Sequence, residues 1–327
     1  MRFLVIGAGA MGRNHVRVLN ALPRVKEVLV VDERKEALDE VSKAGFGKVS
    51  TFTSLEEALK QKPDAASIVT PTPSHYDVFR KVNGRVPAVL VEKPISFDSK
   101  TGMKIVEEAK RENTVLQIGH VERFNPGVIA LKKNIRQLGA LRYATVHRFG
   151  IPAPRILDDV VIDLAVHDVD VLSFVSGEAA RSVFAMERNV LQENTNDLAS
   201  IVLEFPSFQA TVEANRVTTV KVRELLAVGE KGNARLDYIS QELLFAHSQV
   251  PAEKYSTFDE VVTRVGKGTE VRPFVQKEEP LKLELESFLN AASKGETPLV
   301  TGEDGVRAVE VAQAAMQSAK TGKKVQL

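Results

Sequence analysis

The 327-residue sequence contains no cysteine and no tryptophan, and it carries almost no net charge. The absence of cysteine excludes disulfide bonds, thiolate catalysis and metal sites built on cysteine. A formal charge of +1 gives no reason to expect nucleic acid or an anionic membrane as a partner. No apolar run approaches the roughly 20 residues that a membrane-spanning helix needs. With 43% hydrophobic and 27% charged residues, the composition predicts a globular protein of about two domains.

The N-terminal segment has the pattern of a dinucleotide-binding unit. An apolar run leads into Gly7-x-Gly9-x-x-Gly12, and a second apolar run, 27–31, ends at Asp32. Strand, glycine turn, helix, strand and acid follow one another in the order that such a unit requires. Gly7 would permit the tight turn, and Gly12 would let the helix pack closely on the strand.

The remaining residues of this unit have expected roles toward the cofactor. Gly9 would let the backbone approach a pyrophosphate, and the helix opening at Ala10 and Met11 would present its N–H groups to the phosphates. The carboxylate of Asp32 would pair with the ribose 2′-OH and repel a 2′-phosphate, which favours NAD over NADP. Arg34 lies close enough to leave NADP open. Asp32 could instead cap the helix that follows it.

The same segment loosely resembles a secretory signal. Arg2 precedes an apolar stretch and Ala8-x-Ala10 has the spacing of a cleavage site. Glycines interrupt the apolar stretch early and the basic region is a single arginine. We therefore favour the strand and expect a cytoplasmic enzyme.

Residues 1–118 alternate short apolar runs with helical patterns, as βαβ units do. This alternation predicts an NAD(P)-binding Rossmann domain, an α/β fold with a doubly wound parallel sheet that binds ligands at the carboxyl ends of its strands. The expected strands are 2–6, 27–31, 48–52, 65–70, 87–91 and 115–118, and the expected helices are 34–44, 54–61, 76–84 and 98–112.

After Gly119 strands dominate, which predicts a second, α+β domain over residues 119–327 with a largely antiparallel sheet. The polar segment 248–280 has little pattern and is expected to be a long loop. The expected strands are 141–149, 182–189, 198–205, 208–216, 220–229 and 233–238, and the expected helices are 126–138, 160–175, 281–293 and 304–318.

Glu92-Lys93-Pro94 directly follows the expected strand 87–91, at the carboxyl edge of the sheet. Pro94 restricts Lys93 to an extended conformation. A partly desolvated lysine at this edge would have a lowered pKa and could take part in proton transfer. The alternative is an ordinary surface lysine in a turn.

The neighbouring strand 65–70 ends in a second candidate segment for the cofactor site. Thr70, Pro71 and Thr72 follow this strand, and His75 comes shortly after them. Because strand ends of a parallel sheet meet at one edge, these residues are expected to form another wall of the site. His75 could instead only begin the next helix.

Asp163 and His167 are four residues apart in an apolar segment, so a helix would place both on one face. A carboxylate beside an imidazole fixes its tautomer and supports its charged form, as in a general base. A buried, hydrogen-bonded structural pair is the alternative. The other histidines form no matching cluster, so we expect no metal.

Six further polar residues are candidates for binding the substrate. The segment 119–126 lies between the two expected domains, where an arginine could pair with a phosphate or carboxylate and an amide could bind a sugar hydroxyl. An asparagine before proline also starts a helix, which weakens its claim. The candidates are His120, Glu122, Arg123, Asn125, Arg148 and Arg155.

Taken in order, these motifs resemble those of the glucose–fructose oxidoreductase and inositol dehydrogenase (Gfo/Idh/MocA) family. The resemblance covers essentially the whole chain. It implies a C-terminal α/β domain with an open-faced sheet, oxidation of a sugar or polyol with NAD(P), and homodimers or homotetramers formed through that sheet. The active-site lysine, aspartate and histidine of the family correspond to Lys93, Asp163 and His167. The segment 157–160 departs from the glycine-rich approach that is common in the family.

Segments 119–126 and 161–168 look most similar to UDP-N-acetylglucosamine 3-dehydrogenases. That resemblance implies oxidation of the C3 hydroxyl to a ketone, which a separate PLP-dependent aminotransferase would convert to an amine. His167, oriented by Asp163, would take the hydroxyl proton and Lys93 would stabilise the alkoxide, although the two could exchange roles. The alternatives are a dehydrogenase of a free sugar or polyol, an NAD-dependent glycosidase and a non-catalytic NAD-binding regulator.

Overall fold

The computed structural model describes residues 1–152, 158–191, 193–247 and 269–327. The chain divides into two compact units, and neither is a single stretch of sequence. The first unit is Met1–Phe124 with Glu278–Gln313, and the second is Asn125–Lys277 with Ala314–Leu327. The first unit therefore includes a C-terminal segment that a single boundary at residue 118 leaves out. Within the described ranges, every helix is too short or too polar to cross a membrane.

The first unit is built on a six-stranded parallel sheet in the order β3-β2-β1-β4-β5-β6. This is the strand order of a Rossmann fold, so the fold class expected from the sequence is confirmed. The central strands are buried on both faces, as parallel strands covered by helices must be. The strands are β1 (Arg2–Ile6), β2 (Glu27–Val31), β3 (Val49–Phe52), β4 (Ala65–Ile68), β5 (Ala88–Glu92) and β6 (Val115–Gly119).

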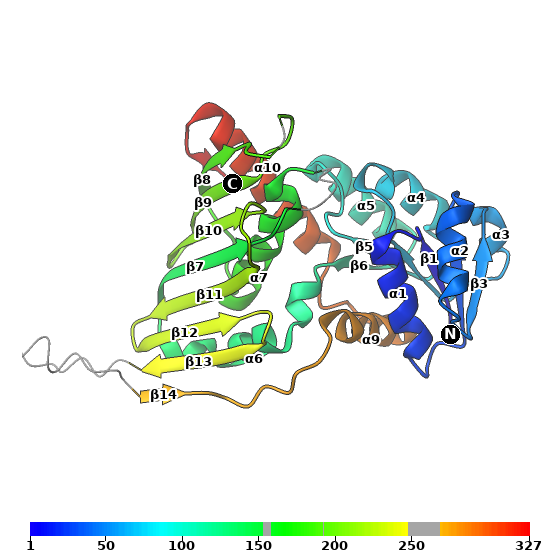
Figure 1. The fold of residues 1–327 in the computed structure, drawn as a ribbon, viewed down its shortest axis with the longest axis horizontal. Helices are drawn as coiled ribbons and strands as arrows, with labels where there is room; N and C mark the ends of the chain where they lie inside the picture. The colour runs from blue at the N-terminus through cyan, green and yellow to red at the C-terminus, as the bar shows by residue number, and fades with distance from the viewer. Residues whose placement is uncertain (153–157, 192, 248–268) are drawn as a thin grey trace, which may run out of the picture. The chain divides into compact units, whose positions relative to one another are not determined.

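Two apolar clusters cover the two faces of this sheet. In one, Phe3 and Leu90 pack with Leu285 and Phe288 of α9 (Pro280–Lys294), beside α1 (Ala10–Ala21). In the other, alternate strand residues such as Ile68 and Val91 pack with Phe79 of α4 (His75–Val82) and Ile105 of α5 (Ser99–Arg111), both helices labelled in Figure 1. The remaining helices of this unit are α2 (Lys35–Lys43), α3 (Leu55–Leu59), the short η1 (Thr72–Ser74) and η2 (Val121–Phe124), and most of α10 (Gly302–Thr321).

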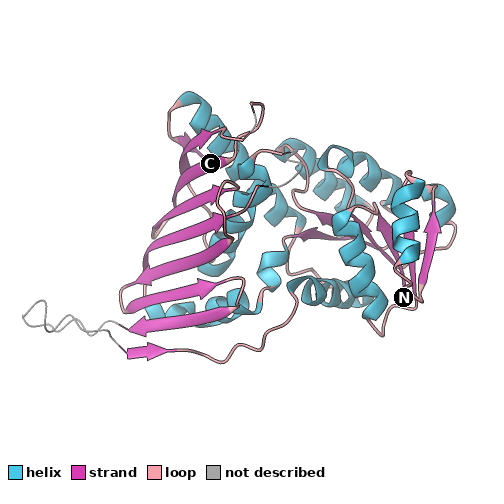
Figure 2. Cartoon of the chain, viewed as in Figure 1, coloured by secondary structure: helices cyan, strands magenta, loops and turns pink. Residues whose placement is uncertain are grey.

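The second unit carries a nine-stranded sheet in the order β14-β13-β12-β11-β7-β10-β9-β8-β15. Every neighbouring pair is antiparallel except β7 and β10, which confirms the largely antiparallel sheet. The strands, magenta in Figure 2, are β7 (Leu141–Phe149), β8 (Ser182–Arg188), β9 (Leu198–Glu204), β10 (Gln209–Asn215), β11 (Val222–Gly229), β12 (Gly232–Asp237), β13 (Glu242–His247), β14 (Thr269–Val271) and β15 (Val325–Gln326).

One face of the nine-stranded sheet packs against helices of the same unit (Figure 1). These are α6 (Pro126–Asn134), η3 (Ile135–Leu138), the π-helical turn η4 (Val161–Ala165) and α7 (Val166–Ser176). Residues of β10 alternate between buried and more exposed, because only one face is covered. Strands β13, β14 and β15 were not expected, and β14 lies within the segment 248–280 that we expected to be a loop.

Candidate functional site

The glycine turn after β1 is shaped by contacts between backbone atoms. Gly7 has a φ of +106°, which favours glycine, and its N–H donates to the carbonyl of Val31. A Cβ on Gly12 would lie 1.9 Å from the Gly7 carbonyl oxygen, so only glycine fits there. A Cβ on Gly9 would have no heavy atom within 4 Å. Gly9, whose Cβ position is open, is the residue that the sequence predicts to face a pyrophosphate.

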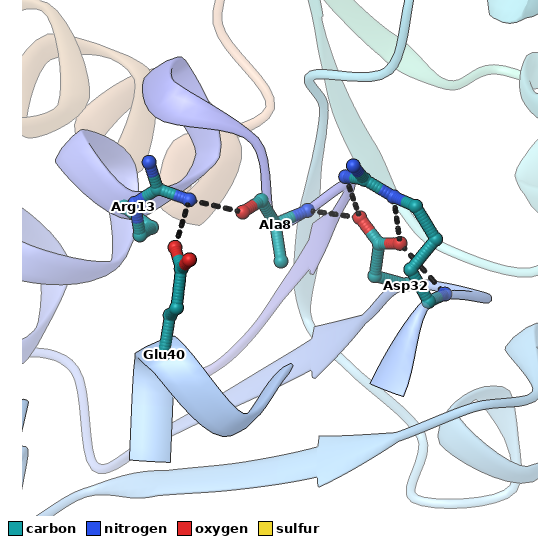
Figure 3. A network of polar contacts seen from close by, with 5 residues as sticks. Ala8, Arg13, Asp32 and Glu40 are labelled. Atoms are coloured by element: carbon teal, nitrogen blue, oxygen red, sulfur yellow. Dashed lines mark hydrogen bonds and ion pairs between the residues drawn. The ribbon is translucent and has the colours of Figure 1, made fainter. Parts of the chain in front are cut away.

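Asp32, at the end of β2, is tied directly to this turn (Figure 3). Its Oδ2 accepts a hydrogen bond of 2.8 Å from the Ala8 N–H. The backbone N–H and side chain of Arg34 donate to the same carboxylate. Partial burial acts to raise the pKa of Asp32, but these hydrogen bonds outweigh it and the pKa lies below its usual value. Asp32 is therefore an anion held beside the glycine turn.

The N-terminus of α1 fits a phosphate group. Gly9 is the N-cap residue, and Ala10 and Met11 open a helix with no acidic residue in its first turn. The partial positive charge of the helix terminus is therefore not neutralised by a carboxylate of that turn. Arg13, shown in Figure 3, donates to the Ala8 carbonyl and pairs with Glu40, which braces the other side of the turn.

His75 connects the segments that follow β4 and β5. Its Nε2 lies 2.8 Å from the Thr70 carbonyl oxygen and its Nδ1 lies 3.0 Å from that of Pro94. Burial lowers the pKa of His75. Pro71 and Thr72 lie at the start of η1, where they are more exposed than the histidine. His75 thus lies against both candidate segments inside the first unit, where its neutral ring can donate to one of the two carbonyls, and it also begins α4, as the alternative interpretation predicted.

Glu92 is the last residue of β5, and its buried carboxylate contacts both its chain neighbour and α1. Its Oε2 accepts a hydrogen bond from the Lys93 N–H at 3.1 Å, and its Oε1 lies 3.1 Å from His15 Nε2. Lys93 is partly exposed and precedes a cis peptide bond to Pro94. The structure therefore places the backbone of Lys93 at the carboxyl edge of the parallel sheet, as the sequence predicted.

In the second unit, Asp163 and His167 lie on either side of the junction between η4 and α7. The helix expected over 160–175 is present, but its first turn, residues 161–165, is π-helical and only the rest is α-helical. Such turns are common at functional sites. Asp163 Oδ2 lies 3.9 Å from Arg216 Nη1, and Arg216 is buried and donates to the Asp158 carbonyl.

Arg148, on β7, forms a buried ion pair. Its Nε and Nη2 donate to the two carboxylate oxygens of Asp168 at 2.6 and 2.9 Å, and its guanidinium lies over the ring of Tyr238. The side chains of Arg148 and Asp168 are only 2% and 0% exposed. The expectation that Arg148 binds substrate gains no support from this geometry, which ties β7 to the helix that carries His167.

The other substrate candidates are mostly buried. Arg123 donates to Asp304 and to the Leu299 carbonyl within the first unit. Asn125 caps α6 through the Gly127 N–H and donates to the Tyr238 carbonyl, as its helix-start interpretation predicted. His120 and Glu122 are 1% and 7% exposed, and Arg155 lies outside the described residues. In the ranges that the structure describes, no three His, Asp or Glu side chains gather as a metal site would require.

Three buried polar residues around these positions were not singled out from the sequence. They are His15 beside Glu92, Asp168 beside Arg148, and Arg216 beside Asp163. His15 precedes Val16 and Leu19 on the buried face of α1, and that spacing was a usable signal. The partner of Arg148 lies on helix α7 and the partner of Asp163 directly follows β10, and local sequence patterns do not reveal either pairing.

Comparison with known proteins accounts for nearly the whole chain. The model of an oxidoreductase family's NAD-binding Rossmann fold matches residues 1–120, and that of the family's C-terminal alpha/beta domain matches residues 132–327. UDP-N-acetylglucosamine 3-dehydrogenase of Acidithiobacillus ferrooxidans is 29% identical over 321 residues, covering 97% of this chain and 96% of the relative. Inositol 2-dehydrogenase of Rhizobium meliloti is 26% identical, with coverage of 97% and 96%.

A solved structure of the Acidithiobacillus ferrooxidans dehydrogenase aligns with a TM-score of 0.85 at 26% identity, covering 98% of each chain. Both halves of the family's architecture are therefore present here, in the same order. The chain belongs to the Gfo/Idh/MocA family of oxidoreductases, whose N-terminal domain is an NAD-binding Rossmann fold.

Proposed function

We propose that this chain is an NAD-dependent dehydrogenase that oxidises the C3 hydroxyl of UDP-N-acetylglucosamine to a ketone. The observation that carries the proposal is the end-to-end similarity, at 29% identity, to a UDP-N-acetylglucosamine 3-dehydrogenase. The inositol 2-dehydrogenase that matches at 26% over the same share of the chain favours a second candidate. That candidate is a dehydrogenase of a free sugar or polyol.

The proposed chemistry assigns one task to each of three side chains. His167, with Asp163 in the preceding turn, accepts the proton of the reacting hydroxyl. The ammonium of Lys93 stabilises the negative charge that develops on that oxygen. The nicotinamide, when bound, accepts the hydride. The same chemistry permits Lys93 and His167 to exchange roles.

We propose NAD rather than NADP as the cofactor because of Asp32. A carboxylate that is anionic and fixed by the Ala8 N–H is suited to accept a hydrogen bond from a ribose hydroxyl. It would repel the 2′-phosphate of NADP. Arg34 argues for NADP, because its exposed guanidinium pairs with the Asp32 carboxylate and could turn toward a 2′-phosphate instead.

The test is the growth of NADH absorbance at 340 nm with UDP-N-acetylglucosamine, myo-inositol and glucose as separate substrates. Lys93→Ala and His167→Ala should each lower kcat by about 10²–10⁴-fold, the usual contribution of an acid–base group. Lys100→Ala, at an exposed position of the first unit, is the control for Lys93→Ala. His147→Ala, at a partly exposed position of the second unit, is the control for His167→Ala. Both control variants should retain wild-type turnover.

Turnover with inositol or glucose but not with the UDP-sugar would replace the proposed substrate by the second candidate. Cleavage of a glycoside without net NADH would indicate an NAD-dependent glycosidase. NADH binding without turnover on any of these substrates would favour a regulator. Wild-type turnover in both the Lys93 and His167 variants would refute the catalytic assignment.

We also propose that a second copy of this chain covers the exposed face of the nine-stranded sheet. Strand register places Phe184, Val202 and Thr145 in one row on that face, and Phe184 is 38% exposed. Met186 and Tyr143 add exposed apolar surface to the same face. Light scattering should therefore give a dimer or tetramer mass. A 3-keto product would in turn suit a PLP-dependent aminotransferase as the next enzyme.

A further inference from the structure

One face of the parallel sheet carries buried polar side chains at the end nearest Lys93. Ser67 on β4 and Gln117 on β6 both lie beside Leu90 of β5, and Glu92 comes two residues later on β5. Because side chains alternate along a strand, all three polar residues project to the same face as Leu90. Leu90 belongs to the apolar cluster beneath α1 and α9. The polar group is therefore enclosed between the sheet and these two helices.

Each of the two helices adds a titratable side chain to this layer. His15 of α1 is fully buried and lies 3.1 Å from the Glu92 carboxylate. Glu284 of α9 is fully buried as well. It lies on the same helical stripe as Leu281, Leu285 and Phe288, which pack on the sheet. An ionisable residue thus occupies a core position in α9.

Several atoms of this layer have no hydrogen-bond partner among the described residues. They are Ser67 Oγ, both side-chain polar atoms of Gln117, His15 Nδ1 and both carboxyl oxygens of Glu284. Buried polar groups are almost always satisfied by protein atoms or by enclosed water. Unpartnered atoms on four elements of this layer are groups that enclosed water would satisfy.

The charge of this layer follows from its burial. Burial, and then the negative charge of Glu92, raise the pKa of Glu284 well above its ordinary value, which favours the protonated carboxyl. The Glu92 carboxylate accepts a hydrogen bond from the Lys93 N–H and lies beside His15 Nε2. The other charged groups on elements packed against α9 lie on α1 and η2. On α1 they are Arg13, which pairs with Glu40, and Arg17, which pairs with Glu279. On η2 they are Glu122 and Arg123, and Arg123 pairs with Asp304.

We propose that Glu284, Glu92 and His15, with Ser67, Gln117 and enclosed water, form a proton-sharing network that fixes the turn carrying Lys93. The neutral Glu284 carboxyl donates its proton to enclosed water that in turn donates to the Glu92 carboxylate, and Glu92 holds the Lys93 backbone by its hydrogen bond. Glu284 is thus a positioning residue. The effect of Glu284 on turnover rests on the proposed function, through the role of Lys93. The sharing of a proton between Glu284 and Glu92 does not depend on that function.

The experiment compares Glu284→Gln, which keeps a neutral hydrogen-bond donor, with Glu284→Met, which removes it at similar volume. Leu285→Met is the packing control on the same helix. We expect Glu284→Met to lower kcat at least tenfold with the sugar KM little changed, and Glu284→Gln to restore kcat to within about threefold of wild type. In wild type, deprotonation of Glu284 should reduce kcat as pH rises, and Glu284→Gln should lack that alkaline fall.

Two readouts test the network without turnover. Infrared difference spectra should show a protonated carboxyl at neutral pH in wild type that is absent in Glu284→Gln. Because the folded-state pKa of Glu284 is raised, wild-type stability should fall with rising pH relative to Glu284→Gln. If both readouts fail, the network is refuted even in an active enzyme. If both hold but no sugar is oxidised, only the proposed function fails. Wild-type kcat in Glu284→Met, with both readouts intact, would refute the positioning role.

Discussion

Alanine substitution should separate the two tasks of the glycine turn, with Gly12 serving the fold and Gly9 serving the cofactor. A Cβ on Gly12 would meet the Gly7 carbonyl oxygen at 1.9 Å and Val69 Cγ2 at 3.2 Å. Backbone would have to move by about 1 Å, and overpacking of this kind costs typically 1–3 kcal/mol. Because the clash is with backbone, we expect about 3 kcal/mol for Gly12→Ala.

Gly9→Ala should leave the unfolding free energy almost unchanged. Its Cβ would have nothing within 4 Å, and its φ of −66° is open to any residue. Alanine is a poorer N-cap than glycine by roughly 0.5–1 kcal/mol. It also restricts the unfolded chain, which stabilises the folded state by about 0.4–1 kcal/mol. The two effects nearly cancel.

For NADH affinity, unlike for stability, we expect substitution of Gly9 to have a large effect. If the backbone at Gly9 approaches the pyrophosphate, a methyl group there should weaken NADH binding at least tenfold, about 1.4 kcal/mol. Urea unfolding followed by circular dichroism gives the stabilities, and calorimetric titration with NADH gives the affinities. Wild-type NADH affinity in Gly9→Ala would refute the assignment of this position. Wild-type stability in Gly12→Ala would refute the steric reasoning.

Two further predictions concern the second unit. Asp168→Asn removes the carboxylate that pairs with the buried guanidinium of Arg148 and should lower the unfolding free energy by about 3–5 kcal/mol. Arg142→Ala breaks an exposed ion pair and should cost less than about 1 kcal/mol in the same urea titration. Burial and then Asp159 raise the pKa of Glu187 to about 7, so its contribution to stability falls between about pH 4.5 and 7. The unfolding free energy of Glu187→Gln should therefore exceed that of wild type by about 1–2 kcal/mol at pH 8, after solvent screening, and equal it near pH 4. A difference in unfolding free energy that stays constant between pH 4 and 8 would contradict the raised pKa.

The sequence predicted the Rossmann unit well because its signals are local. The glycine spacing, the apolar strands and Asp32 lie within one short stretch, and their order together matches one βαβ unit. The periodicity of 281–293 predicted a helix equally well, and α9 is present there. That periodicity does not say which sheet the helix covers. Consequently the return of residues 278–313 to the first unit was not foreseen.

The buried ion pair of Arg148 was not predicted, although the sequence held a signal for it. Ala144 and Val146 precede it at even spacing on β7 and are buried, so alternation points Arg148 to the covered face. An inward arginine needs a buried acid, and Asp168 is adjacent to the histidine that had been singled out. No sequence pattern predicted the π-helical turn at 161–165, because its apolar residues and Asp163 are equally compatible with an α-helix.

The contacts inside the first unit connect its cofactor turn to the turn that carries Lys93. Gly12 and His15 lie one helical turn apart on α1, so the helix that begins at the glycine turn also holds Glu92 through His15. His75 adds a second tie from the neighbouring strand end. A ligand that shifts the N-terminus of α1 would therefore also act on the backbone of Lys93, through the buried contact of His15 with Glu92 and the part-buried hydrogen bond from the Lys93 N–H to Glu92.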